Sequence, residues 1–187
     1  NGLDYDVWNP ETDPVLGRNT YNDQTVIDAK RAIKADLQGE FGLTKDPAKP
    51  LIGVVGRIDV GQKGFELLLP LIEKLSQSAQ IFLLGSVDKE FEGEFTEKAE
   101  QFGQSFHFTC GHNEKLAHRI YAASDLFLMP SQYEPCGLTQ MIALRYGAVP
   151  VVRATGGLMD TILDVEKTGK KGNGFVFSAY SSPGLNE

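Results

Sequence analysis

The feature that most constrains the fold is the alternation of short apolar runs with helical patterns along the 187 residues. Apolar runs of four to six residues that end at Gly, Pro or a polar turn are typical of buried strands. Strands that alternate with helices predict a parallel sheet with helices on both faces. We therefore expect an α/β fold with a Rossmann-like, doubly wound parallel sheet of about six strands. The expected strands are 51–56, 81–84, 106–109, 125–129, 148–152 and 175–177.

The helical segments lie between these strands, where apolar residues recur at spacings of three and four. Pro70 falls inside one of them, so that helix either begins there or is kinked. The expected domains are an extended lead-in at 1–21, one Rossmann-like domain at 22–178 and an unpatterned tail at 179–187. The expected helices are 22–41, a segment from 65, 91–102, 114–123, a segment from 137 and 158–165, with a charged loop at 167–173.

The composition excludes several classes of protein. The net charge of -7 argues against a general nucleic-acid binder, which would carry a basic face. The two cysteines provide no disulfide framework, which fits a reducing compartment. No apolar run approaches the roughly 20 residues of a membrane span, and the polar start does not resemble a signal peptide. We expect neither a nucleic-acid nor a membrane partner.

The stretch 125–140 predicts a strand, a polar loop and a helix that begins near Gly137. The first N–H groups of a helix lack internal partners and favour an anion. Glu134 lies in the loop before this helix, where its carboxylate would repel a phosphate. The combination suits a ligand with a phosphate at one end and hydroxyl groups at the other, although a plain surface carboxylate is the alternative.

The loop after the first strand, 56–64, has the glycines of a phosphate-binding loop but lacks its Lys and Ser/Thr at the required places. Arg57 and Lys63 can still converge on a diphosphate and offset its charge as it departs. The alternative is a solvated loop with two surface cations. Gly156 and Gly157 after the fifth strand predict either a second anion- or acceptor-binding helix start or a tight turn.

Two patterns suggest metal ligands but fit them poorly. Asp4-Tyr5-Asp6 is formally a D-x-D motif, yet no strand precedes it, so a solvated turn is favoured. His107, Cys110, His112 and His118 include no paired Cys-x-x-Cys, and His107 and His118 are expected in structural roles. We expect no metal site.

Four separated motifs resemble the nucleotide-sugar-binding half of the glycogen and starch synthases. The main one is Glu134-Pro135-Cys136-Gly137-Leu138-Thr139-Gln140, followed by the run from Pro150 to Leu158. The opening 1–10 and the pair Gly56-Arg57 with Gln62-Lys63-Gly64 belong to the same resemblance. It covers nearly the whole chain and implies the C-terminal half of a two-domain GT-B glycosyltransferase.

The resemblance implies roles for individual residues. Arg57, Lys63 and Glu134 match catalytic positions, with Glu134 at the donor glucose, although many synthases have one residue fewer between the arginine and the lysine. Gly137, Leu138 and Thr139 match positions that hold ribose and phosphate. His112 matches an aromatic position at the base, and Cys136 matches a packing or sugar-contact position.

The implied parent enzyme transfers glucose from ADP-glucose to the non-reducing end of an α-1,4-glucan, with retention and without cofactor or metal. It would be cytoplasmic, or plastidial in a plant. The amino-terminal domain that completes the site in this family is absent from the 187 residues, so the fragment is expected to bind nucleotide without catalysing. ADP-glucose against UDP-glucose and glycogen against starch stay open. The alternative is a non-catalytic nucleotide- or glucan-binding module, and an oxidoreductase is disfavoured because no strand precedes a G-x-G-x-x-G.

Overall fold

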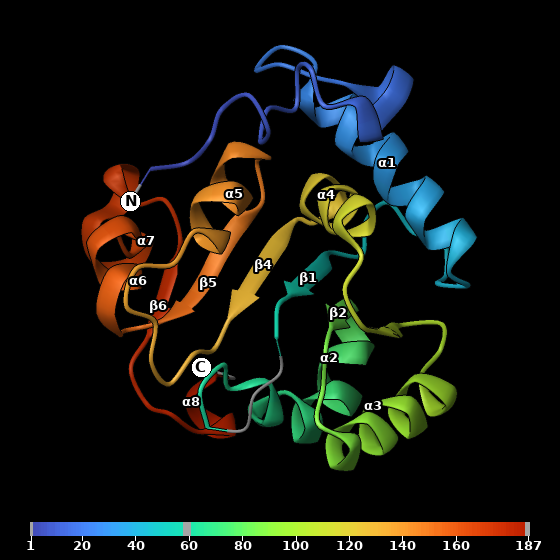
Figure 1. The fold of residues 1–187 in the computed structure, drawn as a ribbon, viewed down its shortest axis with the longest axis vertical. Helices are drawn as coiled ribbons and strands as arrows, with labels where there is room; N and C mark the ends of the chain where they lie inside the picture. The colour runs from blue at the N-terminus through green and yellow to red at the C-terminus, as the bar shows by residue number, and fades with distance from the viewer. Residues whose placement is uncertain (1, 58–60, 186–187) are drawn as a thin grey trace.

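Six parallel strands form a single sheet in a computed structural model that describes residues 2–57 and 61–185 (Figure 1). Asn1 of the opening motif, residues 58–60 of the loop after the first strand and the last two tail residues lie outside the described residues. The predicted doubly wound sheet is confirmed, and its strand order is β3-β2-β1-β4-β5-β6. The strands are β1 (Leu51–Val55), β2 (Gln80–Gly85), β3 (Phe106–Cys110), β4 (Leu126–Met129), β5 (Val149–Arg153) and β6 (Phe175–Phe177).

The helices occupy both faces of the sheet, with α1, α4 and α5 on one face and α2 and α3 on the other (Figure 1). The α-helices are α1 (Val26–Glu40), α2 (Ile72–Ser78), α3 (Lys89–Gln101), α4 (Glu114–Ala123), α5 (Thr139–Arg145), α6 (Gly156–Thr161), α7 (Val165–Thr168) and α8 (Ser182–Leu185). The 3-10 helices are η1 (Pro14–Asn19), η2 (Phe65–Leu67), η3 (Leu69–Leu71) and η4 (Gly169–Lys171).

The strand order reverses direction between β1 and β4, which pair through Ile52 with Leu126 and Gly53 with Phe127. In doubly wound sheets, ligands bind beyond the carboxyl ends of the strands at such a switch point. The fold therefore directs the loops after β1 and β4 toward one place, and these loops carry Lys63 and Glu134.

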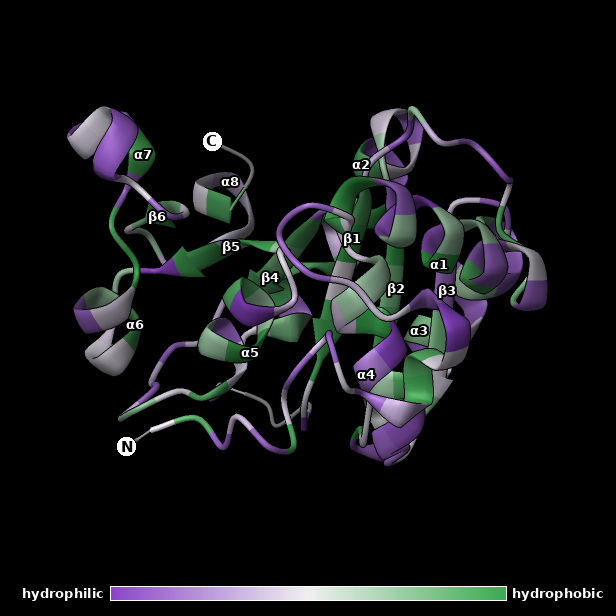
Figure 2. Cartoon of the chain, turned by 90° about the horizontal axis from the view of Figure 1, so that it is seen from above, coloured by the Kyte–Doolittle hydropathy of each residue, from purple (hydrophilic) through white to green (hydrophobic). Residues whose placement is uncertain are grey.

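Each face of the sheet carries its own apolar core. One core joins β1, β2, β4 and β5 to α1, α4 and α5 through residues such as Leu37, Phe82 and Tyr146. The other packs η2, η3, α2 and α3 on the opposite face, with Phe95 and Phe106 fully buried. Figure 2 shows the hydrophobic strands between helices that carry hydrophilic residues on their outer sides. This burial supplies the main free energy of folding.

The contact between α4 and the sheet depends on a glycine in β1. A Cβ atom on Gly53 would lie 2.1 Å from the Ser124 Oγ and 3.0 Å from the Ile120 Cγ2. The Ser124 hydroxyl is held in place by the hydrogen bond that it donates to the Ile120 carbonyl at 2.6 Å. Glycine is thus the residue that lets the end of α4 approach β1.

Several local predictions need correction. For the segment from Phe65, the kinked helix is the wrong alternative, because η2 and η3 come first and α2 begins at Ile72. The other alternative, a helix that begins at Pro70, is close to the observed start, since Pro70 is the second residue of η3. The predicted helix 158–165 is divided into α6 and α7. The predicted loop 167–173 contains η4, and the predicted unpatterned tail contains α8. Of these short elements, α7 ends before Gly169 and η4 before Gly172, whereas η2, η3 and α6 end without a glycine or a proline that would mark the boundary in the sequence.

The lead-in is folded against the domain and contains η1, in place of the extended chain that we expected. Asp13 is 2% exposed, and its Oδ2 accepts hydrogen bonds from the Tyr146 hydroxyl at 2.6 Å and pairs with the His118 Nδ1 at 2.8 Å. Trp8 stacks on the His118 ring with centroids 4.1 Å apart. The expected structural role of His118 is confirmed: it connects the lead-in to α4.

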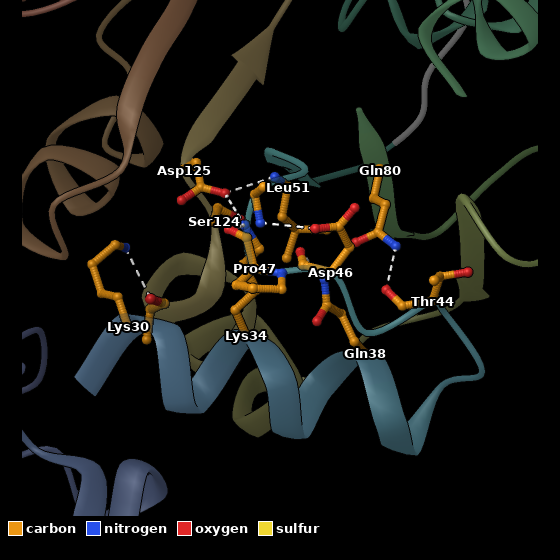
Figure 3. A network of polar contacts seen from close by, with 12 residues as sticks. Lys30, Lys34, Gln38, Thr44, Asp46, Pro47, Leu51, Gln80, Ser124 and Asp125 are labelled. Carbon is orange, nitrogen blue, oxygen red and sulfur yellow. Dashed lines mark hydrogen bonds and ion pairs between the residues drawn. The ribbon is translucent and has the colours of Figure 1, made fainter. Parts of the chain in front are cut away.

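A polar network joins α1 to the amino ends of the central strands (Figure 3). The Asp125 Oδ2 accepts from the Leu51 N–H and from the Lys34 ammonium, each at 2.7 Å. Farther along α1, the Gln38 amide donates to the Gln80 Oε1 at 2.6 Å. Buried polar groups that are satisfied in this way fix the position of α1 along the sheet.

Lys30 lies on the same face of α1 (Figure 3). It donates hydrogen bonds to backbone carbonyls at the carboxyl ends of α4 and α5. Its Nζ donates to the Ala122 carbonyl at 2.9 Å and the Tyr146 carbonyl at 3.0 Å. Burial, with a smaller contribution from the nearby Lys34 charge, lowers the pKa of Lys30 to about 7, although Asp125 opposes the change. A neutral amine keeps two N–H donors, so both bonds survive deprotonation.

Stability should therefore rise from pH 7 to pH 10 through Lys30. In this range the unfolded chain holds the lysine proton and the folded chain does not, so raising the pH favours folding. The free energy of unfolding of the unsubstituted protein should increase with pH relative to Lys30→Met, measured by urea unfolding at both pH values. Lys74→Met, at an exposed lysine of α2, is the control. If the unsubstituted protein and Lys30→Met differed in their free energy of unfolding by the same amount at pH 7 and at pH 10, the prediction would be contradicted.

Among the residues that the structure describes, no helix combines the length and the apolar character that crossing a membrane requires.

Candidate functional site

A cavity of about 520 Å³ opens at the carboxyl ends of β1, β2 and β3. Its walls come from the loops that follow these strands and from one side of α4. The position agrees with the switch point of the sheet, where the loop after β1 approaches the loop between β4 and α5. The lining residues are Val55, Gly56, Arg57, Lys63, Leu84, Gly85, Ser86, Gly111, His112, Asn113, Ala117, Tyr121 and Thr139.

Four of the eight predicted site residues meet in this cavity. Arg57 and Lys63 come from the loop after β1, His112 from the loop after β3 and Thr139 from the start of α5, and all four line its wall. The cavity thus joins two cationic side chains with an exposed imidazole. This set can bind an anionic group at one end and a flat ring at the other.

The other four predicted residues lie in the segment 134–138, beside the cavity and outside its lining. Leu138 is 44% exposed and Cys136 is exposed, whereas Gly137 is buried. The exposed Cys136 thiol does not support the packing alternative for this residue. Glu134 is only 7% exposed, so the alternative of a plain surface carboxylate is wrong.

Glu134 and Lys63 form an ion pair that the sequence does not predict. The Lys63 Nζ lies 2.6 Å from the Glu134 Oε2, and the Ser131 hydroxyl donates to the same oxygen at 3.2 Å. The Lys63 side chain is 25% exposed and the Glu134 side chain 9%. A carboxylate beside the cavity is therefore compatible with a nearby phosphate, because Lys63, which lines the cavity, compensates the charge of Glu134.

The two glycines at the start of α6 hold the Glu134 loop by backbone contact. The Gly157 N–H donates to the Glu134 carbonyl at 2.9 Å. A Cβ atom on Gly156 would lie 2.1 Å from the Glu134 carbonyl oxygen, and one on Gly157 would lie 2.1 Å from the Cys136 carbonyl oxygen. Of the two interpretations of this glycine pair, the observed contacts favour a close turn that supports the loop.

Gln140 fixes the other end of the same loop. Its side chain is fully buried, and its Nε2 donates to the Gly137 carbonyl and the Thr161 hydroxyl, each at 3.0 Å. Gly137 has a φ of 68°, and a Cβ atom there would lie 2.4 Å from the Gln140 Oε1. Helix α5 consequently begins at Thr139, two residues later than expected, and its seven residues follow a turn that Gly137 makes.

The far side of the cavity is built on α4. Asn113 caps this helix, since its side chain accepts from the Leu116 N–H at 3.0 Å. Tyr121 is 3% exposed, and burial raises the pKa of its hydroxyl far above the usual range, although a hydrogen bond with Thr139 opposes the rise. The hydroxyl therefore stays protonated and available for hydrogen bonding next to Thr139.

The candidate metal ligands are not gathered into one site. No group of three or more His, Cys, Asp or Glu side chains is arranged to hold a metal within residues 2–57 and 61–185. His107 of β3 packs between the Phe41 and Phe82 rings, and partial burial lowers its pKa, although a hydrogen bond that it donates to the Phe41 backbone opposes this. The predicted solvated turn at the D-x-D motif is confirmed, because the Asp4 Oδ1 accepts from the Asp6 N–H at 2.9 Å.

With this geometry established, a family model described as glycosyl transferases group 1 matches residues 39–187. The chain belongs to this family. Its fold is that of the Rossmann-like half of a GT-B glycosyltransferase, as the sequence resemblance predicted.

Relatives within the family are named glycogen synthases. That of Dechloromonas aromatica is 50% identical over 180 residues, which cover 94% of this chain and 36% of the relative. That of Clostridium beijerinckii is 44% identical over 186 residues, which cover 99% of this chain and 38% of the relative. These relatives confirm the resemblance to glycogen synthases, and the chain spans less than two fifths of their length.

Solved structures agree with the sequence relatives. The catalytic domain of starch synthase IV from Arabidopsis thaliana, bound to ADP and acarbose, superimposes with a TM-score of 0.89 at 38% identity, covering 100% of this chain and 39% of that one. The C-terminal domain of the group 1 family protein LpcC from Francisella tularensis has a TM-score of 0.65 at 19% identity, covering 97% and 83%. The second comparison supports the fold alone.

Three contributions to this glycosyl transferase site were missed in the sequence. The Lys63–Glu134 pair joins residues 71 positions apart, and no local pattern marks it. Tyr121 lies on the apolar side of a helical pattern, which is typical of a core residue. Gln140 belongs to the main motif, but its burial and its hydrogen bond with Thr161 arise from the tertiary structure and leave no local signal in the sequence.

The glycine support of the Glu134 loop can be tested through stability. Gly157→Ala should destabilise the protein by about 1–3 kcal/mol, because the new methyl group would press on the Cys136 carbonyl. Gly93→Ala in α3 is the matched control: a Cβ there meets nothing within 4 Å, and alanine favours a helix by roughly 0.5–1 kcal/mol. Urea unfolding measures both. If the two variants were equally stable, the Gly157 contact would not constrain the loop.

Proposed function

We propose that this chain is the donor-binding domain of a glycogen or starch synthase. The reaction is transfer of glucose from ADP-glucose to the non-reducing end of an α-1,4-glucan, with retention at the anomeric carbon. The observation that carries the proposal is the cavity at the switch point, in which Arg57, Lys63, His112 and Thr139 meet. The relatives named glycogen synthase and the starch synthase bound to ADP support it.

In this proposal the cavity holds the nucleotide. Arg57 and Lys63 face the diphosphate, because two cations offset the charge that develops as the glucosyl bond breaks. Exposed His112 offers a flat ring to the adenine. Thr139, next to the buried Tyr121 hydroxyl, contacts the ribose, and the turn 137–138 adds backbone donors.

Glu134 lies where the glucosyl group would leave the diphosphate. In the structure its carboxylate is paired with Lys63. When a donor binds, the diphosphate competes with Glu134 for the ammonium group. Lys63 then turns partly toward the phosphate, and the carboxylate becomes available to a sugar hydroxyl or to positive charge at the anomeric carbon. Diphosphate binding and sugar recognition would thus be coupled through one lysine.

The proposal also covers partners and compartment. The glucan and a second domain of the same enzyme complete the active site, so this chain alone binds nucleotide without elongating glucan. Closure of the two domains would exclude water and limit hydrolysis of the donor. The chemistry uses the donor itself and needs no further cofactor. The enzyme would act in the cytoplasm, or in the plastid of a plant.

The diphosphate contacts predict a selective loss of affinity. Lys63→Met and Arg57→Met should each weaken ADP binding by about tenfold or more, which is the loss of one charge-assisted hydrogen bond. Adenosine, which lacks the phosphates, should bind each variant within about twofold of the unsubstituted chain. Isothermal calorimetry with ADP, UDP and adenosine measures this.

The same titrations test the nucleotide. Tighter binding of UDP than of ADP would assign the domain to UDP-glucose. Equal losses for ADP and adenosine would place Arg57 and Lys63 outside the diphosphate site. Lys74→Met, which removes an exposed lysine of α2, controls for the change in net charge.

The role of Glu134 is tested in the complete enzyme that contains this domain. Glu134→Gln should lower kcat strongly, because a carboxylate that meets charge in the transition state contributes mainly to turnover. ADP affinity should stay the same or rise by up to about fivefold, since an ion pair of this partly exposed kind is worth up to about 1 kcal/mol and Lys63 is released from it.

Steady-state elongation and ADP titration of one preparation give both quantities. Glu94→Gln, at an exposed carboxylate of α3, is the control for net charge. Normal turnover, or loss of ADP binding in step with activity, would assign Glu134 a structural role.

A further inference from the structure

The loop segment 61–66, which carries Lys63, is held by contacts from two distant parts of the chain. It follows β1, includes the first two residues of η2, and lies between the end of β4 and the segment after β6. The position of the Lys63 ammonium depends on these contacts, because its own backbone lies in irregular structure. A residue that fixes this loop would therefore affect the diphosphate without touching it.

The first contact comes from Tyr180, three residues beyond β6. Its hydroxyl donates a short hydrogen bond to the Glu66 Oε1, and the Gly61 N–H donates to the same oxygen at 3.3 Å. Burial and the hydrogen bond with Glu66 raise the pKa of Tyr180 far above the usual range, so the hydroxyl remains a donor. Glu66 thereby links Tyr180 to the beginning of the loop.

The second contact runs through the loop after β4. The Gln132 N–H donates to the Gln62 carbonyl at 2.9 Å. The Arg153 guanidinium donates to the Gln132 carbonyl at 2.8 Å and lies over the Tyr180 ring at 5.4 Å from its centroid. The contacts therefore close into a ring that passes through Tyr180, Glu66, the loop, Gln132 and Arg153, and Lys63 lies within the span of loop that this ring holds.

Close packing at Gly64 leaves the loop little freedom. Gly64 has a φ of 71°, which L side chains rarely adopt. A Cβ atom there would lie 2.1 Å from the Pro130 carbonyl oxygen and 3.1 Å from the Tyr180 Cε2. The residue after Lys63 is thus packed between the end of β4 and the Tyr180 ring.

We propose that Tyr180 is a positioning residue for diphosphate binding: through Glu66 and Arg153 it holds the loop that presents Lys63 to the donor. The inference rests on the proposed function, since it concerns the same diphosphate. It adds that the segment after β6 takes part in donor binding, although none of its residues lines the cavity.

Tyr180→Phe isolates this role. It removes the hydroxyl and keeps the ring over which Arg153 lies. The segment also keeps a separate attachment, because the Ser182 hydroxyl donates to the Leu67 carbonyl at 2.9 Å. ADP should bind about five- to tenfold more weakly. The lost hydrogen bond is to the charged Glu66, and its loss affects ADP only through the position of Lys63. Adenosine should bind within about twofold of the unsubstituted chain, which also reports that the cavity is intact.

A double-mutant cycle decides whether Tyr180 acts through Lys63. ADP affinity is measured by calorimetry for Tyr180→Phe, Lys63→Met and the double variant. If Tyr180 only positions Lys63, then Tyr180→Phe should change ADP affinity by less than about twofold in the Lys63→Met background. A merely structural tyrosine would weaken ADP by the same factor in both backgrounds, and this additive result would overturn the proposal.

The control is Tyr133→Phe, which removes a hydroxyl from a tyrosine that is 60% exposed in the adjoining loop. It should leave the ADP and adenosine affinities unchanged. The proposed function and the role of Tyr180 are distinguished by these variants. An unaltered ADP affinity in Lys63→Met contradicts the proposed function. A loss in Lys63→Met together with an unaltered affinity in Tyr180→Phe overturns the Tyr180 proposal alone.

Discussion

The structure depends on the contact between β1 and β4, because the sheet reverses its direction of growth there and the cavity opens beyond it. The backbone pairing is short, and only Ile52 and Gly53 of β1 are in register with β4. Asp125 strengthens it from the amino end, where one carboxylate oxygen accepts from the Leu51 N–H and from Lys34. The Lys34 side chain is only 6% exposed, so removing the Asp125 carboxylate would leave a buried ammonium without its charged partner, which is costly. Helix α1 is therefore attached at the one place where the two halves of the sheet meet.

The predictable part of the fold is the part with strong periodicity. Strand β6 and helix α4 have the predicted bounds, and the other strands agree within one or two residues. Short apolar runs and long amphipathic stretches leave few alternatives in an α/β chain. The segment around Pro70 and the one after Leu158 were less well predicted, because the shape of a single turn depends on tertiary contacts. The lead-in was misjudged for a similar reason: the burial of Asp13 depends on His118 and Tyr146, more than a hundred positions away.

For the candidate site, the sequence predicts which residues are present and does not predict how they pair. Arg57, Lys63, His112 and Thr139 follow strands of one sheet, so the topology alone brings them together. The ion pair of Lys63 and Glu134 requires the loops after β1 and β4 to lie close enough for the two side chains to come within hydrogen-bonding distance. That distance is set by glycines at 64, 156 and 157, whose neighbours are backbone carbonyls. A motif records such glycines without stating which backbone they approach.

The pairing of β1 with β4 also bears on how the chain folds. Gly53 and Phe127 are partners across about seventy intervening positions, and in a parallel sheet no hairpin can bring them together early. Closing the chain between these two residues lowers its conformational entropy before the central contacts can form. Folding should therefore be slow compared with a helical bundle of similar length. Until β4 arrives, one side of β1 presents unpaired N–H and C=O groups, which can pair with other chains. In a newly made polypeptide, this central strand is the most exposed to aggregation while the second half of the sheet is still being synthesised.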